Sequence, residues 1–279
     1  MGIKSRRVSR GVKSGVLRAA VVPPRQMEDI IMPCIPFPEP LDEGIVVERR
    51  NRFDMLVDLR ELPVECHCPT TWNIGRLNVA GRPCLLSKCS DPRKTSYTVE
   101  AVSVDEPAAP RKRWIGINQT ASNRYIETFL KNDCFPDMLP SSSRVRRARL
   151  SGKSNLDFIV GDVSIAIKTP LLTLPGIPPD MRSDARPSSP NTERFRKRIT
   201  KLACSLPNIR RVLLLTVYLH DHPDFHLSEY RQEYPGHYEA IREIAAYSAS
   251  LGIENWQVNL SLDSAGVRLD RYLPLSTQE

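Results

Sequence analysis

The sequence predicts an α/β fold of the α+β kind, in which a small β-barrel precedes a mixed sheet flanked by helices. Two patterns lead to this class. Residues 44–104 hold several short, β-rich segments separated by turn residues, without a convincing helical pattern, which is typical of a small barrel. After residue 113, helical and strand patterns alternate, as they do when helices cover a sheet.

The barrel prediction depends on five short segments rich in β-branched or large apolar residues. The predicted strands are 45–47, 55–59, 64–68, 83–86 and 97–102. Two proline-containing segments flank them. The four prolines of residues 32–40 exclude a helix or a central strand, so we expect a linker there. Residues 105–113 are predicted to be a second linker.

The second domain combines helix and strand patterns. Residues 122–130 and 191–204 place apolar side chains on one face, as amphipathic helices do. Residues 212–219 form a continuous apolar run, which is typical of a buried strand. The remaining expectations are strands at 156–160, 163–167 and 256–262, a loop at 175–190, and a helix at 238–251 that ends before Gly252.

These patterns divide the chain into three parts. Residues 1–40 form a basic segment with a proline-rich linker, residues 41–110 an OB-fold-like barrel, and residues 111–279 the second domain. No run of 18 apolar residues is present, so no membrane partner is expected. Seven irregularly spaced cysteines suit a reducing compartment better than a disulfide framework.

The N-terminal segment carries most of the excess positive charge. The net charge is +8, with 40 basic and 32 acidic residues. Seven of the basic residues precede the first acid, Glu28, which leaves 33 against 32 in the rest of the chain: Lys4, Arg6, Arg7, Arg10, Lys13, Arg18 and Arg25. Such a segment is typical of a mitochondrial presequence. A basic arm that touches DNA or RNA fits the same composition, with a cytoplasmic or nuclear location.

A predicted hairpin holds the most informative side chains. If Gly161-Asp162 is a two-residue turn, Val160 opposes Val163 and Asp157 opposes residue 166. Residue 168 shares the face of residue 166. Acids at 157 and 166 with a lysine at 168 would hold a divalent cation and orient its water, as in metal-dependent phosphodiesterases. Here residue 166 is Ala166. An ordinary hairpin with Asp157 and Lys168 facing solvent fits the same spacing.

A series of short motifs runs in one order along residues 45–262. The motifs are Arg50-Asn51-Arg52-Phe53, Leu56-Val57-Asp58-Leu59, Glu65-Cys66-His67-Cys68-Pro69, Asp91 to Val102, Ile115-Gly116-Ile117-Asn118, Asn123-Arg124, Asn155-Leu156-Asp157-Phe158, Ile165-Ala166-Ile167-Lys168, and Thr192-Glu193-Arg194 with Lys197. Together they resemble the sugar fermentation stimulation protein (SfsA) family. The resemblance implies an OB-type barrel, a restriction-endonuclease-like domain of the PD-(D/E)XK nuclease type, and DNA or RNA as the partner.

The chain departs from the family pattern at the site itself. Two places before the lysine the family has a glutamate, and this chain has Ala166. Glu127 or Glu193 would have to supply a migrated acid, as some nucleases of this type do. We therefore expect a remnant catalytic site of Asp157 and Lys168, with no cofactor or with weakly bound Mg²⁺ or Mn²⁺ on Asp157.

Three groups of cations are candidate nucleic-acid-binding surfaces. They lie on the predicted helix 191–204, before the predicted hairpin, and on a barrel strand beside an aromatic ring. The residues are Arg49, Arg50, Arg52, Phe53, Arg146, Arg149, Arg194, Lys197, Arg198 and Lys201. A solvated charged face is the alternative for the helix, and burial in the barrel core is the more expected role of Phe53.

Two groups of metal-ligand residue types are discounted. Cys66, Cys68, Cys84 and Cys89 do not have the spacing of a known zinc knuckle. His220, His222 and His226 follow a buried strand and are interpreted as exposed loop histidines.

The sequence thus predicts a catalytically impaired, nuclease-like protein that binds nucleic acid. An active nuclease with a migrated acid is the alternative enzyme. A structural component of a larger, mitochondrial ribonucleoprotein assembly is the alternative without activity.

Overall fold

The computed structural model describes most of the chain after its N-terminal segment. The described residues are 33–70, 74, 77–89, 95–140, 144–148, 157–171, 177, 196–197, 199–200 and 211–275.

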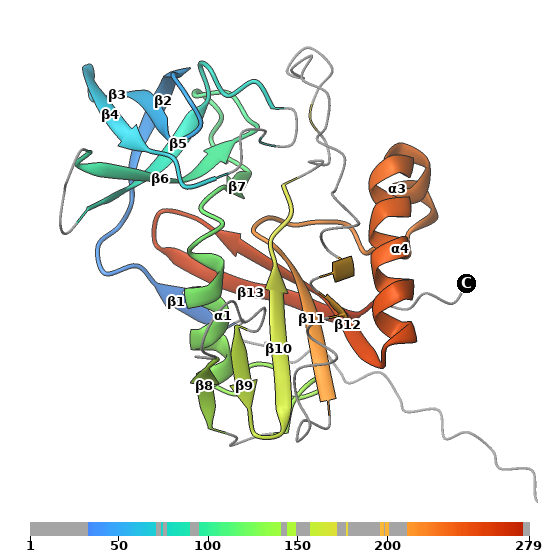
Figure 1. Cartoon of the computed structure of the whole chain (residues 1–279). Helices are drawn as coiled ribbons and strands as arrows, with labels where there is room; N and C mark the ends of the chain where they lie inside the picture. The colour runs from blue at the N-terminus through green and yellow to red at the C-terminus, as the bar shows by residue number, and fades with distance from the viewer. Residues whose placement is uncertain are drawn as a thin grey trace, which may run out of the picture. The chain divides into compact units, whose positions relative to one another are not determined.

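Six strands form the first sheet, in the order β4-β3-β2-β5-β6-β7 (Figure 1). They are β2 (Asp42–Arg49), β3 (Asp54–Leu59), β4 (Leu62–His67), β5 (Pro83–Lys88), β6 (Tyr97–Ser103) and β7 (Trp114–Gly116). Strands β4 and β6 also pair in parallel, which closes β2 to β6 into a barrel. This strand order is that of an OB fold, and closure covers the strand edges. The predicted OB-type barrel is confirmed.

The second sheet has seven strands in the order β1-β13-β12-β11-β10-β9-β8. They are β1 (Cys34–Pro36), β8 (Val145–Arg147), β9 (Phe158–Val160), β10 (Val163–Lys168), β11 (Arg211–Tyr218), β12 (Ile253–Leu262) and β13 (Gly266–Pro274). Strands β10, β11 and β12 are mutually parallel, and the outer strands are antiparallel. The predicted mixed sheet is therefore confirmed. The helices whose bounds are described are α1 (Ser122–Lys131), α3 (Ser228–Glu233) and α4 (Pro235–Ser250).

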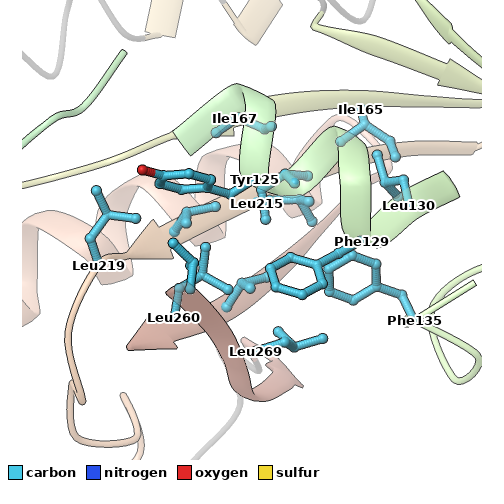
Figure 2. Close-up of a cluster of buried hydrophobic side chains, with 14 of the residues drawn as sticks. Tyr125, Phe129, Leu130, Phe135, Ile165, Ile167, Leu215, Leu219, Leu260 and Leu269 are labelled. Atoms are coloured by element: carbon cyan, nitrogen blue, oxygen red, sulfur yellow. The ribbon is translucent and has the colours of Figure 1, made fainter. Parts of the chain in front are cut away.

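Different elements cover the two faces of this sheet. On one face, α1 packs Tyr125, Ile126 and Phe129 against side chains of β10 and β11, such as Ile165 and Leu215 (Figure 2). The other face holds a smaller apolar cluster, which includes Ile244 and Tyr247 of α4. Because strand side chains alternate, consecutive residues of β10 enter these two different environments.

Two glycines allow backbone segments to approach closely. A Cβ on Gly44 would lie 2.6 Å from Cγ1 of Val57, across the β2–β3 pair. A Cβ on Gly116 would lie 2.5 Å from Cβ of Leu219 and 2.6 Å from Leu262. Instead, the N–H of Gly116 donates to the carbonyl of Leu219 at 2.7 Å. The last strand of the first sheet thus contacts the end of β11 at a place that only glycine fits.

Several expectations about the elements were wrong. The predicted linker 32–40 contains β1, which pairs at the sheet edge, where prolines are tolerated. Strand β13 follows the expected final strand, and it was missed because its charged residues break the apolar pattern. The short elements β8 and α3 were also missed. The predicted loop 175–190 and the predicted helix 191–204 fall mostly outside the described residues.

No helix among the described residues combines the length and the apolar composition needed to cross a membrane.

Candidate functional site

The β9–β10 hairpin forms as predicted. Gly161 has a φ of 59°, which suits a two-residue turn with Asp162. The register pairs Val160 with Val163 and Phe158 with Ile165. The regular ladder ends there, and the N–H of Asp157 donates to the carbonyl of Ile165 at 2.9 Å. Asp157 therefore lies beside Ile165 of β10, and the register does not contain the expected pair of Asp157 with residue 166.

Both carboxylate oxygens of Asp157 accept hydrogen bonds from neutral donors. The backbone N–H of Ile167 donates to Oδ2 at 2.7 Å. The side-chain amide of Asn123, at the start of α1, donates to Oδ1 at 2.9 Å. These donors orient the carboxylate and leave it lone pairs for one further ligand.

Ala166 lies in an apolar environment. It is 3% exposed and clusters with Ile199, Leu214 and Ile253. Alternation along β10 places Ala166 on the face of Lys168, whose side chain is half-buried. The position that would carry a second acid therefore packs against aliphatic side chains.

Glu127 is engaged by two cations. Its carboxylate accepts from Nε of Arg147 at 2.7 Å and pairs with Nζ of Lys131 at 2.8 Å. Arg147, followed by Lys131, lowers the pKa of Glu127. Glu193 lies outside the described residues. Within the described ranges, no three His, Cys, Asp or Glu side chains are placed to hold a metal ion together.

A short segment between the barrel and α1 organises the site, and it was not among the predicted site residues. The side chain of Asn118 donates to Glu100 of β6 at 2.8 Å. Gln119 donates to the carbonyl of Thr169, directly after Lys168. Asn123 then reaches Asp157. The motifs ending in Asn118 and beginning with Asn123 were the available sequence signal, but they do not say what these amides contact.

The barrel cations gather at the turn between β2 and β3. Arg49 ends β2 and donates to the carbonyl of Arg52 at 3.1 Å. Burial lowers the pKa of Arg49. Arg50 pairs with Glu48 at 2.9 Å and with Glu65 of β4. These contacts hold the turn against the neighbouring strand.

Phe53 is 51% exposed, so the expectation that it belongs to the barrel core was wrong. The guanidinium carbon of Arg52 lies 5.0 Å from the centre of its ring. The side-chain oxygen of Asn51 accepts from the N–H of Phe53 at 2.7 Å and from the N–H of Asp54 at 3.1 Å. This local turn directs the ring outward, and strand alternation does not extend into it.

The remaining candidate cations are only partly described. Arg146 of β8 and Lys197 are exposed. Four others lie outside the described residues: Arg149, Arg194, Arg198 and Lys201. Residues around Lys197 are helical, as expected, but Arg196 stacks 4.6 Å from the ring centre of Tyr247 on α4.

The cysteines of the barrel are core residues. Cys66, Cys68 and Cys84 are fully buried. Burial raises the pKa of Cys66 to about 12 and that of Cys68 to about 11. Protonated thiols are poor metal ligands.

The interpretation of the histidines after β11 as exposed was wrong for two of them. His220 is 2% exposed and His222 is fully buried, whereas His226 is exposed. His222 stacks on Tyr218 with ring centres 3.6 Å apart. The hydroxyl of Tyr218 also lies 3.3 Å from Nε2 of His237 on α4. The polar side chains of His220 and His222, after β11, are thus buried in the interior of the protein.

Comparisons with known proteins agree with this architecture. Residues 47–117 match the model of the SfsA N-terminal OB domain. A "Sugar fermentation stimulation protein homolog" of Synechococcus sp. (strain JA-3-3Ab) is 36% identical over 133 residues, which cover 47% of this chain and 53% of the relative. A homolog of the same description from Methylobacterium sp. (strain 4-46) is 31% identical over 143 residues, covering 49% and 59%. The chain thus spans about half the length of the curated relatives it matches.

One solved structure is similar over a longer part of the chain. It is described as the structure of Pyrococcus furiosus SfsA in complex with Ca²⁺. The TM-score is 0.61 at 18% sequence identity, and the match covers 86% of this chain and 96% of the other. At this identity the likeness establishes the fold.

Proposed function

The chain belongs to the SfsA family, and from this premise we propose that it binds nucleic acid through a nuclease-like scaffold whose catalytic site is impaired. Residues 41–110 and 111–279 are the proposed limits of its two domains. DNA or RNA is the proposed partner.

The environment of Ala166 carries the proposal of impaired catalysis. A phosphodiester-cleaving metal site needs acidic ligands to hold a divalent cation and to lower the pKa of its bound water. Ala166, two places before Lys168, clusters with Leu214 and Ile253. Such apolar packing disfavours any charged group at that position.

Asp157 alone supports at most weak binding of Mg²⁺ or Mn²⁺. One carboxylate supplies a single negative charge, and its two oxygens already accept hydrogen bonds. The Pyrococcus furiosus structure in complex with Ca²⁺ supports divalent-ion binding by this fold. We propose that this chain keeps a weakened form of that capacity.

The β2–β3 turn supports the proposal of nucleic-acid binding. An exposed aromatic ring with an arginine beside it suits base stacking and phosphate contact on a single strand. Arg146 adds an exposed cation on the edge strand β8, near the Asp157 hairpin.

Incubation of the purified protein with labelled DNA and RNA in Mg²⁺ or Mn²⁺ tests the impairment. We expect filter binding with a clear salt dependence and no cleavage. Cleavage that is lost in Asp157→Ala and kept in Asp58→Ala, an exposed carboxylate on β3, would overturn the proposal of impairment. Absence of binding at low salt would overturn the proposal of a nucleic-acid partner and favour a structural role in an assembly.

The mitochondrial location is proposed from the basic N-terminal segment alone. Fusion of residues 1–40 to a fluorescent protein tests it. Import into mitochondria supports targeting, and a cytoplasmic or nuclear signal contradicts it.

A further inference from the structure

A groove of about 720 Å³ lies between the segment before β2, the end of β5 and the first turn of α1. Its walls include Phe37, Lys88, Glu100, Arg124 and Tyr125. Volumes of this order are typical of sites for small molecules or single nucleotides. None of these residues belongs to the Asp157 hairpin or to the β2–β3 turn.

Glu100 is a buried acid that faces this groove. It is 5% exposed. The hydroxyl of Ser87 donates to Oε1 at 2.6 Å, and the amide of Asn118 donates to Oε2 at 2.8 Å. No cation lies within ion-pair distance of this carboxylate in the described part of the chain. The hydroxyl of Tyr125 is a third neutral donor to this carboxylate. A buried acid with only neutral donors is costly, and the lone pairs of the carboxylate are not all used.

Tyr125 closes the floor of the groove next to Glu100. Burial, together with the nearby Glu100 carboxylate, raises the pKa of the Tyr125 hydroxyl, so it stays protonated at neutral pH. Figure 2 shows the ring at the margin of the apolar cluster, with its oxygen pointing away from Phe129 and Phe135. The groove therefore has a polar floor.

The rim of the groove is cationic and weakly neutralised. Arg124 is exposed and forms no ion pair with a described acid. Lys88 pairs with Glu39 at 3.3 Å, but both side chains are more than 60% exposed. Exposed pairs of this kind contribute little and exchange readily with another anion. Arg124 and Lys88 are thus available to a phosphate.

An aromatic ring and prolines form the apolar wall. The ring of Phe37 lies 6.5 Å from that of Tyr125 in an edge-on arrangement. Pro36, Pro38 and Pro40 continue this wall. A planar base of any identity can pack against such a surface.

We propose that this groove binds one nucleotide of a single strand, with its phosphate at Arg124 and Lys88 and the N–H edge of its base at Glu100. Guanine fits best, because its N1–H and N2–H donors lie side by side and match one carboxylate. A base can reach a buried acid only when it is unpaired and turned out of the stack. The inference rests on the proposed nucleic-acid binding and names the base that the protein reads.

Fluorescence anisotropy with labelled oligoadenylate decamers, as DNA and as RNA, tests this site in the full chain. We expect the decamer with one central guanine to bind about tenfold more tightly than the decamer of adenines alone. Glu100→Gln should bring this ratio close to one. Arg124→Ala should weaken binding of both decamers equally and reduce the salt slope by about one. Arg111→Ala, an exposed arginine of the β6–β7 connection, is the matched control and should change neither.

The outcomes separate the two proposals. Equal binding of both decamers, or a guanine preference that survives in Glu100→Gln, overturns the groove inference while nucleic-acid binding stands. Absence of binding by the unaltered protein overturns both. Because Glu100 is buried, circular dichroism must show that Glu100→Gln is folded. The exposed Arg124→Ala variant provides an independent test, and an effect no larger than that of Arg111→Ala overturns the phosphate contact.

Discussion

The β2–β3 turn and the β9–β10 hairpin are two connections between antiparallel strands with opposite surroundings. The first presents Arg52 and an exposed Phe53 to solvent. The second places Asp157 against the backbone of Ile165 and Ile167, while Ala166 packs into an aliphatic cluster. Charge for holding a polyanion is present at the surface of the barrel, whereas the second acid for metal chemistry is missing in the sheet. We therefore propose that binding and cleavage depend on different parts of the molecule.

The largest expected effect comes from restoring the missing acid. Ala166→Glu should lower the free energy of unfolding by about 4 kcal/mol, since it places a carboxylate among the aliphatic side chains of Ile199, Leu214 and Ile253. Urea denaturation measures the loss. Ala246→Glu on the exposed side of α4 is the matched control, with a change under about 0.5 kcal/mol. A stable Ala166→Glu protein that cleaves DNA or RNA in Mg²⁺ would break the comparison, because the site would then lack only this acid.

The interior of the sheet domain should also be sensitive to acid. Burial lowers the pKa of His220 to about 3, of His222 to about 2 and of His237 to about 4. Since these values lie below the ordinary value of 6.5, the unfolded chain binds more protons. The stability that the neutral rings contribute is complete above pH 6.5. It is lost progressively as pH falls below 6.5 toward the folded-state values.

Replacing one of these rings measures the effect. His220→Phe should remove about 1.4 kcal/mol of the acid loss per pH unit below 6.5, because the phenyl ring keeps the packing against Tyr218 and does not titrate. Unfolding free energies at pH 7.5 and 5.5 give this difference. The exposed His226→Gln variant should follow the unaltered protein. An identical pH dependence for His220→Phe would show that this ring is accessible to protons in the folded state.

A substitution in the β2–β3 turn should change the affinity for single-stranded nucleic acid and leave the stability of the protein unchanged. Phe53→Ala should weaken single-strand binding about fivefold, or roughly 1 kcal/mol, because one stacking surface is removed. Leu62→Ala is a matched control, since Leu62 is 66% exposed on the same barrel. Filter binding with oligothymidylate provides the measurement. Equal affinities for both variants would place the single strand elsewhere on the protein.

The smallest expected effect concerns Glu127. Arg147→Ala should cost less than about 1 kcal/mol of stability, because the Arg147 side chain is 58% exposed. The freed carboxylate keeps its pair with Lys131. Thermal unfolding gives the stability change, and incubation with Mn²⁺ and labelled DNA gives the activity. Cleavage by Arg147→Ala, absent in Arg146→Ala, would mean that Glu127 can act as the migrated acid.

Local signals predicted the elements that define the candidate site. Gly161-Asp162 between two apolar runs was enough to predict the hairpin and the pairing of Val160 with Val163, because a two-residue turn sets the register of its strands. The five barrel strands were predicted from short runs of β-branched and large apolar residues. By contrast, β13 carries charges on a half-buried strand and gave no clear alternation.

Exposure could not be predicted at the positions that now matter most. Phe53 was expected in the core, but the side chain of Asn51 shapes a turn that directs it outward. His220 and His222 were expected in solvent. They are buried because α4 and the chain after β11 cover them. No sequence pattern around residue 220 predicts this burial.

The sequence by itself determined the two-part architecture, the hairpin and the presence of an alanine at position 166, where the family resemblance implies an acid, because periodicity, turn chemistry and residue identity are local properties. Only the tertiary structure decided what surrounds that alanine, which cations engage Glu127, and that Glu100, Arg124 and Phe37 line one groove. These contacts join residues far apart in the chain. They depend on how sheets and helices pack, and local pattern does not specify that packing.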